Sequence, residues 1–236
     1  MKFIYLLSAF SLLTMINIPD ANGQDNYDAN DWANLKYYQA ANHALPPADA
    51  GEERIVFMGN SITEGWIKSD PSFFAGKPYV NRGISGQTTP QMLIRFRQDV
   101  IDLHPTVVVL LAGTNDIAEN RGPTTLEAIY GNIISMAELA MVHDIRMVIC
   151  SVLPAHDYPW RPDLAPAEKI YALNKILSSY CQLANIPYVD FHTPMSDQQK
   201  GLQKIYGEDG VHPNLVGYRF MEPLVEAGIA KALKRK

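Results

Sequence analysis

The sequence predicts an α/β protein built on a doubly wound parallel sheet. From Arg54 onward, short apolar runs alternate with longer segments of helical periodicity, which is typical of a parallel sheet covered by helices on both faces. Residues 107–111 are all apolar and therefore belong to a central strand. A chain of 236 residues, 47% hydrophobic and 19% charged, is ordinary for one globular domain, which we place at residues 54–236.

Each expected element has its own signal. Apolar runs bounded by turn residues predict strands at residues 54–58, 79–81, 106–111, 146–153 and 188–191. Thr89 and Pro90 predict an N-cap and a first-turn proline for a helix that reaches about residue 103. Thr124 or Thr125 begins the next helix, which carries apolar residues at helical spacing. Two further helices are expected at about residues 166–183 and 213–233.

The N-terminus predicts an exported protein. Lys2 precedes an apolar stretch over residues 3–18, and small residues at Ala21 and Gly23 indicate a signal peptide of residues 1–23 cleaved after Gly23. The stretch is shorter than the roughly 20 residues that a membrane span needs, so we expect a secreted or periplasmic chain without a stable membrane anchor. Residues 24–53 are polar, and the helical spacing of Trp32, Leu35 and Tyr38 predicts a docked N-terminal helix.

Composition and cysteine usage narrow the function classes. A net charge of -5 without an internal basic cluster argues against a nucleic-acid partner. Cys150 and Cys181 could form a bridge in an exported chain, but their expected places toward opposite ends of the sheet favour two buried free thiols. No HExxH, Walker or GxGxxG pattern occurs, so we expect neither a metal nor a cofactor.

Polar motifs follow the predicted strands. Ser61 comes after the first strand, Gly86 after the second and Asn115 after the third, while His212 stands directly before the last helix. In an open α/β sheet, ligands bind at the carboxyl ends of the strands. We therefore expect these four residues to meet in one crevice.

Ser61, Asp209 and His212 have the chemistry of a nucleophile, an orienting acid and a base. Asp209 precedes His212 by three residues, a spacing at which a carboxylate can hold Nδ1 and leave Nε2 to face Ser61. The simpler interpretations are an N-cap serine and a turn followed by a helix start. His192, which ends a strand, is the alternative base.

Two residues are candidates for oxyanion donors. Asn115 follows the most hydrophobic strand, where an amide side chain has no packing role, and its NH₂ can donate to an oxyanion. Gly86 can present a backbone N–H without an obstructing side chain. Both could instead be turn formers. Ser85 is a poor nucleophile candidate, because Gly83-Ile84-Ser85-Gly86 is one residue short of the GxSxG elbow.

Together the blocks Gly59-Asn60-Ser61, Gly86, Gly113-Thr114-Asn115-Asp116 and Asp209-Gly210-Val211-His212 resemble the SGNH hydrolases, also called the GDSL esterase/lipase superfamily. The resemblance covers residues 55–214 and implies a three-layer α/β/α sandwich with a flavodoxin-like, five-stranded sheet in the order 2-1-3-4-5. It also implies a Ser61, His212 and Asp209 triad, and an oxyanion hole formed by Gly86, Asn115 and the Ser61 amide. Asn60 departs from the usual GDS, and the wording GNSITEGW and LLAGTND is closer to the platelet-activating-factor acetylhydrolase-like branch.

These observations predict a secreted serine ester hydrolase that acts through an acyl-enzyme. Resemblance and export lead us to expect a short acyl group, in particular acetyl on a carbohydrate, and therefore a small-molecule or glycan ester as substrate. Asn60, Tyr158 and Trp160 are candidate substrate-binding residues, and Arg161 lies in the same loop as the two aromatics. The alternatives are a lipase, lysophospholipase or thioesterase for longer chains, and a non-catalytic carbohydrate-binding module. The oligomeric state stays open.

Overall fold

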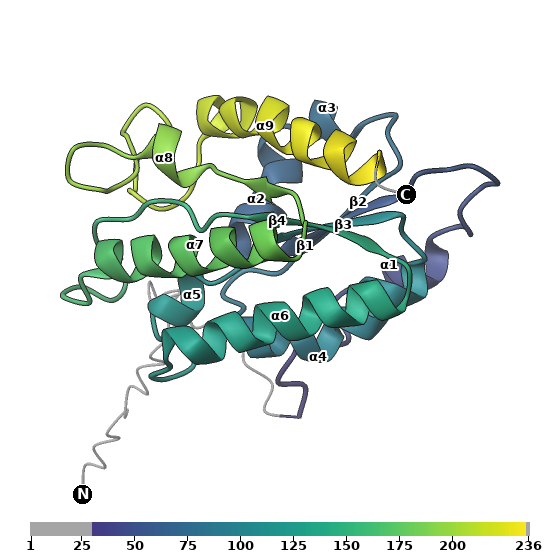
Figure 1. Cartoon of the computed structure of the whole chain (residues 1–236), viewed down its shortest axis with the longest axis horizontal. Coiled ribbons are helices and arrows are strands. Elements are labelled where there is room, and N and C mark those ends of the chain that lie inside the picture. Colours follow the sequence, from purple (N-terminus) through teal and green to yellow (C-terminus); the bar gives the residue numbers. More distant parts are fainter. Residues whose placement is uncertain (1–29, 235–236) are drawn as a thin grey trace, which may run out of the picture.

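A computed structural model describes residues 30–234 and shows a central sheet between two layers of helices (Figure 1). All five strands are parallel and lie in the order β2-β1-β3-β4-β5. They are β1 (Ile55–Gly59), β2 (Tyr79–Gly83), β3 (Val107–Leu111), β4 (Arg146–Cys150) and β5 (Tyr188–Val189). The predicted α/β/α sandwich and its flavodoxin-like strand order are confirmed.

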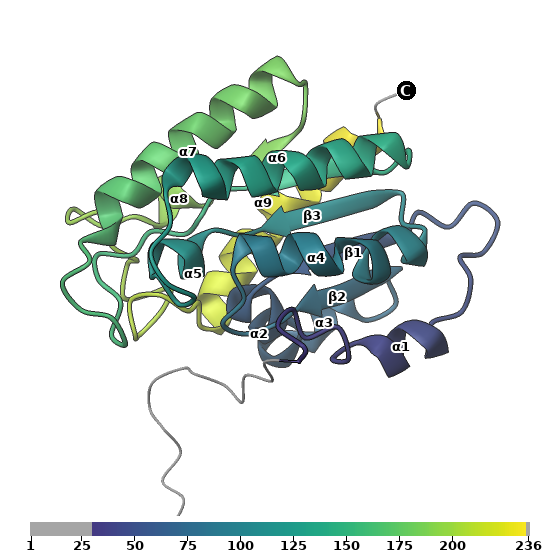
Figure 2. The same ribbon diagram turned by 90° about the horizontal axis from the view of Figure 1, so that it is seen from below.

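Helices cover both faces of the sheet. One layer contains α2 (Ser61–Ser69), α3 (Pro71–Phe74) and α9 (Leu215–Leu233), and the other contains α4 (Thr89–Asp99), α6 (Leu126–Val142) and α7 (Pro166–Leu183). Figure 2 shows the second layer lying over the strands. The short helices α5 (Thr114–Ile117) and α8 (His192–Met195) follow β3 and β5.

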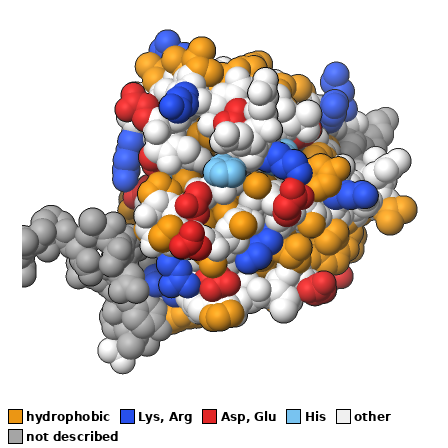
Figure 3. Space-filling view, turned by 90° about the vertical axis from the view of Figure 1, so that its left-hand side faces the viewer, with side chains coloured by type: hydrophobic (Ala, Val, Ile, Leu, Met, Phe, Trp, Pro, Cys, Tyr) orange, Lys and Arg blue, Asp and Glu red, His pale blue; other side chains and the backbone are white. Residues whose placement is uncertain are grey.

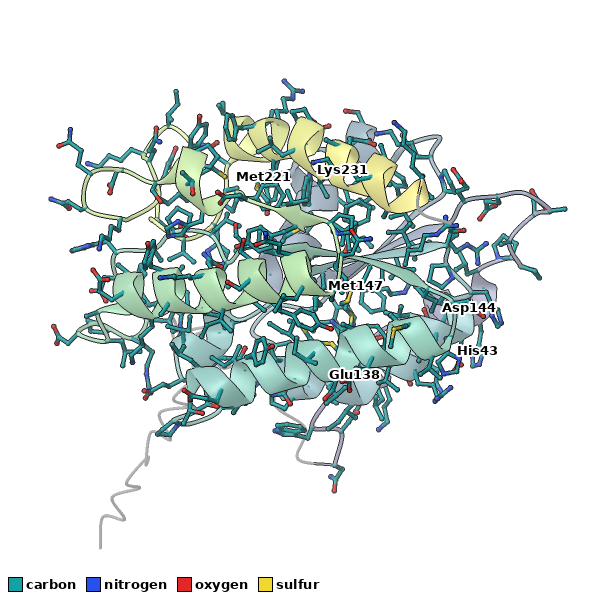
Figure 4. All side chains as sticks on the ribbon, in the orientation of Figure 1. His43, Glu138, Asp144, Met147, Met221 and Lys231 are labelled. Carbon is teal, nitrogen blue, oxygen red and sulfur yellow. The ribbon has the colours of Figure 1, made fainter. Side chains whose placement is uncertain are left out.

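The two faces of the sheet carry separate hydrophobic cores, because side chains alternate along a strand. In β1, Phe57 packs toward α2 and α9, whereas Met58 packs toward α4. Figure 4 shows the same division: Met147 of β4 and Met221 of α9 lie in the interior, and Glu138 of α6 faces outward. Strand β3 is buried along its whole length, as its apolar sequence predicts.

Several boundaries differ from the predictions. Helix α4 is capped by Thr88, one residue before the predicted Thr89, and the Thr88 amide donates to Gln91 Oε1 (3.0 Å). It ends at Asp99, and residues 101–103 form the separate 3₁₀ turn η1 (Ile101–Leu103). Helix α9 begins at Leu215, because Asn214 caps it by accepting the Gly217 amide (2.9 Å). Thr125 caps α6, as one of the two predicted alternatives.

Strands β4 and β5 are shorter than predicted at their carboxyl ends. Beyond Cys150, one more backbone bond joins the Ser151 amide to the Val189 carbonyl (2.9 Å), and side chains then supply the hydrogen-bond partners. Asn174 Oδ1 accepts the Val152 amide (2.8 Å), and Ser151 Oγ accepts the amides of Phe191 and His192, both at 2.9 Å. The chain therefore leaves the sheet after Ser151, and the side chains of Ser151 and Asn174 hold the segments that follow.

The N-terminal segment contains less helix than expected. Among residues 30–53, only α1 (Gln39–Ala44) is helical, whereas residues 31–38 form turns in which Asp31 accepts the amides of Leu35 and Lys36. Helix α1 contacts α4 and lies along the β2 edge of the sheet (Figure 2). The predicted signal peptide lies outside the described residues. Within residues 30–234, no helix is long and apolar enough to cross a bilayer.

Both cysteines are free and buried, as expected. Cys150 of β4 packs in the core beneath α9, and Cys181 of α7 packs in the core on the other side of the sheet. The sheet itself therefore separates the two thiols. The structure thus places them on opposite faces, and their separation toward opposite ends of the sheet stays a prediction.

Candidate active site

The carboxyl ends of the strands bring the four sequence blocks together. Ser61 begins α2 directly after β1, Asn115 lies in α5 after β3, and His212 precedes α9. Seen from this side, the surface mixes hydrophobic, acidic and basic side chains without a large area of one charge (Figure 3). A cleft of about 240 Å³ opens here, and its lining consists of Ser61, Ser85, Gly86, Asn115, Asn120, Trp160 and His212.

Ser61, His212 and Asp209 form one continuous hydrogen-bonded series. The Ser61 Oγ lies 3.0 Å from His212 Nε2, and His212 Nδ1 lies 2.7 Å from Asp209 Oδ2. A carboxylate accepting from Nδ1–H leaves Nε2 unprotonated, and this nitrogen can then accept the proton of the serine hydroxyl. The predicted spacing therefore produces the geometry that a nucleophile, a base and an orienting acid require.

The backbone also orients Asp209. Its Oδ1 accepts the amides of Val211 (2.9 Å) and His212 (2.7 Å), which turn the other oxygen toward the imidazole. Partial burial pushes the pKa of Asp209 upward, but hydrogen bonds from the His212 ring and from these two amides outweigh it and hold the pKa at about 2. Asp209 is therefore ionised throughout the neutral range.

The contacts of Asn60 show that Ser61 is not the N-cap of α2. Asn60 is the N-cap of α2, and its Oδ1 accepts the Ile62 amide (3.1 Å). Ser61 is thus the first helical residue and its hydroxyl is not needed for capping. Asn60 is only 1% exposed and does not line the cleft, so its prediction as a substrate-binding residue is wrong. Asn and Asp are similarly good N-caps, so the departure from GDS at this position preserves the helix start.

The two candidate oxyanion donors both line the cleft, Gly86 from the loop after β2 and Asn115 from α5. Gly86 has a φ of 74°, a left-handed conformation that favours glycine, and it lines the cleft. Asn115 Nδ2 donates to the carbonyl of Gln87 at 3.0 Å. Because an amide nitrogen carries two hydrogens, one remains for a ligand. Ser61, at the first turn of α2, has a backbone N–H that the helix itself does not satisfy.

Of the two predicted aromatics, only Trp160 reaches the cleft. Its ring lies 6.1 Å from the His212 ring, and its Nε1 donates to Asn120 Oδ1 (2.9 Å). Tyr158 is fully buried and packs behind Trp160, with ring centroids 5.2 Å apart, so its prediction as a substrate contact is wrong. Both residues sit in one loop, where the sequence contains no periodicity to show which of them faces outward.

The remaining sequence candidates lie elsewhere. Arg161 points to Glu119, 3.3 Å away, on the outside of the molecule. His192, the alternative base, is buried beside a different pocket that it shares with Asp190 and Tyr188. Ser85 and Asn120 line the cleft but were not among the predicted site residues. Ser85 could have been suspected from its place beside Gly86, whereas Asn120 has no distinguishing signal in its loop.

A hydroxyl, an imidazole and a carboxylate in series at the strand ends have the arrangement that acyl transfer by a serine requires. Comparison with known proteins agrees. Residues 57–220 match the model of the GDSL-like lipase/acylhydrolase family, and the chain belongs to this family. It is a carboxylic ester hydrolase. Of the alternatives that the sequence left open, the family therefore supports an enzyme and not the non-catalytic binding module.

Relatives with known structures or names are consistent with this class. A crystal structure from Bacteroides fragilis, described as an acylhydrolase, is 47% identical with a TM-score of 0.84 and covers 86% of this chain and 99% of its own. Esterase TesA of Pseudomonas aeruginosa is 25% identical over 170 residues, 70% of this chain and 78% of that protein. An uncharacterized lipoprotein of Bacillus subtilis, YqeF, is 27% identical over 121 residues, 44% of this chain but only 50% of that protein.

Proposed function

We propose that the chain is a serine ester hydrolase with Ser61 as nucleophile, His212 as general base and Asp209 as the residue that orients His212. The observation that carries this proposal is the series of contacts from Ser61 Oγ through His212 to Asp209, at 3.0 and 2.7 Å. Hydroxyl and imidazole lie within the distance that proton transfer requires. The class of enzyme follows from the family, and the roles of these three residues are our assignment.

The geometry supports a two-step reaction. Ser61 Oγ attacks the ester carbonyl carbon as its proton passes to His212 Nε2, and Asp209 stabilises the resulting imidazolium. The tetrahedral oxyanion is met by the amides of Ser61 and Gly86 and by Asn115 Nδ2. Collapse breaks the bond to the alcohol, which leaves with the proton from His212. Water then attacks the acyl-enzyme with His212 as base, releasing the acid and restoring Ser61.

We propose a short acyl group, with acetyl as the best fit. A cleft of about 240 Å³ is smaller than the 300–1,000 Å³ typical of pockets for larger ligands, and Trp160 forms one of its walls. Next to Asp209, a second pocket of about 250 Å³ contains His156, Asp157 and Asp197. These polar side chains can bond the hydroxyls of a carbohydrate alcohol, which supports a sugar acetate as substrate.

Export of the enzyme is part of the same proposal. The basic residue, apolar stretch and small residues of positions 1–23 support a cleaved signal peptide. One relative is a lipoprotein, which is consistent with an exported enzyme. N-terminal sequencing of the mature protein tests this point, and we expect it to begin at Gln24.

The proposed role of Ser61 as nucleophile is tested by removing its hydroxyl oxygen. Ser61→Ala should fold normally, because Asn60 and not Ser61 caps α2, and should lose most turnover of p-nitrophenyl acetate. A fluorophosphonate probe should label the wild-type enzyme and not the variant. Turnover near the wild-type level in a folded Ser61→Ala protein would remove Ser61 from the mechanism.

The acyl preference is tested with a series of p-nitrophenyl esters from acetate to dodecanoate, together with acetylated sugars. We expect kcat/KM to fall steadily as the chain lengthens beyond about four carbons, because a longer chain does not fit the cleft. A maximum at eight or more carbons would instead establish the lipase or thioesterase alternative.

A further inference from the structure

Residues 31–44, which we call the N-terminal brace, lie outside the family-matched residues 57–220 yet hold the loop that carries Gly86. Gln87 Nε2 donates to the carbonyl of Ala33 (2.8 Å) on one side of Gly86, and the Tyr38 hydroxyl donates to the carbonyl of Gly83 on the other. Gln91 Nε2 donates to the carbonyl of Trp32 at 2.7 Å and fastens the brace to the first turn of α4. Both ends of the loop are therefore attached to the brace.

Glu64 joins the brace to the residue directly before Gly86. Its Oε2 accepts both the amide of Ser85 (3.0 Å) and the Ser85 hydroxyl. Its Oε1 accepts the Tyr37 hydroxyl (2.6 Å) and the Lys68 ammonium (2.8 Å). Glu64 is 8% exposed and lies one turn after Ser61 on α2. A single carboxylate thus connects the helix of Ser61, the Gly86 loop and the brace.

The charge on Glu64 makes these contacts firm. Burial pushes its pKa upward, but the hydrogen bonds from Lys68, Ser85 and Tyr37 prevail and hold the pKa at about 2. The group is therefore ionised at neutral pH, and hydrogen bonds to an ionised acceptor are roughly twice as strong as neutral ones. Glycine at position 86 has wide backbone freedom, so its amide direction depends on such external restraints.

We propose that Glu64, held by Tyr37 of the N-terminal brace, is a positioning residue that aims the Gly86 amide at the substrate oxygen. The inference rests on the oxyanion role assigned to Gly86 under the proposed function. Neither Glu64 nor Tyr37 lines the cleft, so both act through Ser85 and not by touching the substrate. An oxyanion donor works only when it lies about 2.7–3.1 Å from the charged oxygen, and a small misplacement weakens the transition state more than the bound ester.

Tyr37→Phe is the most direct test, because it removes one hydroxyl from a ring that is 52% exposed. We expect kcat on p-nitrophenyl acetate to fall about 10-fold with KM nearly unchanged, since the loss falls on the transition state. In Glu64→Ala, kcat should fall further, by about 100-fold. In Glu64→Gln, part of the rate should return, because the amide oxygen of the glutamine still accepts the Ser85 N–H. Tyr171→Phe, on a 53% exposed tyrosine of α7, is the matched control and should retain the wild-type kcat.

The labelling rate with fluorophosphonate separates this proposal from the proposed function. An unlabelled wild-type enzyme would show that the Ser61 assignment itself is wrong. If the wild type is labelled, a slower rate in Tyr37→Phe supports positioning by the brace. Wild-type kcat and labelling rate in Tyr37→Phe overturn it, as does a change confined to KM. Tyr37→Phe decides the matter even if Glu64→Ala does not fold.

Discussion

At the start of α2, one residue caps the helix and the next residue carries the hydroxyl that faces His212. Asn60 accepts the Ile62 amide and closes the helix, so Ser61 can direct its hydroxyl to His212. Asn and Ser are similarly good N-caps, which is why the sequence alone left both interpretations open. The three-dimensional partner, His212, lies 151 positions away, and only the fold brings it near.

At the same scale, Asp209→Asn should lower kcat about 10²- to 10⁴-fold. The neutral amide no longer holds the Nδ1–H tautomer of His212 or stabilises the imidazolium. The fold should persist, because the amide oxygen can still accept the amides of Val211 and His212. Steady-state kinetics on p-nitrophenyl acetate, paired with a thermal melt, check this. A kcat within twofold of wild type would show that the imidazole keeps its orientation without the carboxylate.

At the scale of elements, β2 and α2 approach each other at Gly83. A Cβ at this position would lie 2.2 Å from the Glu64 amide nitrogen and 2.8 Å from the Asn60 carbonyl oxygen. Both atoms belong to the backbone of the first turn of α2, which cannot move without displacing Ser61. The close approach keeps Ser61 and the Gly86 loop at a fixed separation.

Gly83→Ala should therefore lower the free energy of unfolding by about 2–3 kcal/mol and also reduce kcat, because the added methyl pushes α2 away from β2. Gly131→Ala is the matched control: this glycine lies in α6, and an added Cβ would meet nothing within 4 Å beyond its own helix in the described part of the chain. For this control we expect a gain of about 0.5–1 kcal/mol. Urea unfolding of both variants measures the difference. Equal midpoints for Gly83→Ala and wild type would mean that the helix yields without cost.

At the scale of the whole molecule, alternation of apolar and helical segments was enough to predict the layers and the parallel sheet, and the strand order followed from the family resemblance. Trp160 and Tyr158 show where prediction stopped, since the sequence cannot say which of two aromatics in one loop faces the cleft. Glu64 shows the same limit, because the sequence does not indicate which residues surround it. In the sequence it is an ordinary helix residue, and its role depends on Ser85 and Tyr37, which only the folded chain places around it.

The buried carboxylate of Asp116 makes the free energy of unfolding depend on pH. Asp116 is 3% exposed and accepts the amide and hydroxyl of Thr89, which joins α5 to the start of α4. Burial raises the pKa of Asp116 from 3.8 to about 6, although the bonds from Thr89 act against it. The folded state thus binds this proton more tightly than the unfolded chain. Its stabilising effect is complete below pH 3.8 and is lost as the pH rises to about 6.

Asp116→Asn should remove this dependence. Relative to wild type, the free energy of unfolding of the variant should rise by about 2–2.5 kcal/mol between pH 4 and pH 7, since each unit of pKa corresponds to about 1.36 kcal/mol and part of the effect is already lost at pH 4. Urea titrations at pH 4, 5, 6 and 7 provide the comparison. Parallel stability profiles for the two proteins would show that Asp116 titrates as an ordinary aspartate in the fold.

Because Cys150 and Cys181 lie on opposite faces of the sheet, the reactivity of each thiol can report when the helix that covers it detaches. Burial raises the pKa of Cys181 to about 12 and that of Cys150 further, so neither reacts while its helices are in place. Thiol-directed reagents added to the native enzyme would modify Cys181 when α7 detaches and Cys150 when α9 detaches. Comparing the two modification rates tells whether the layers separate together or one at a time.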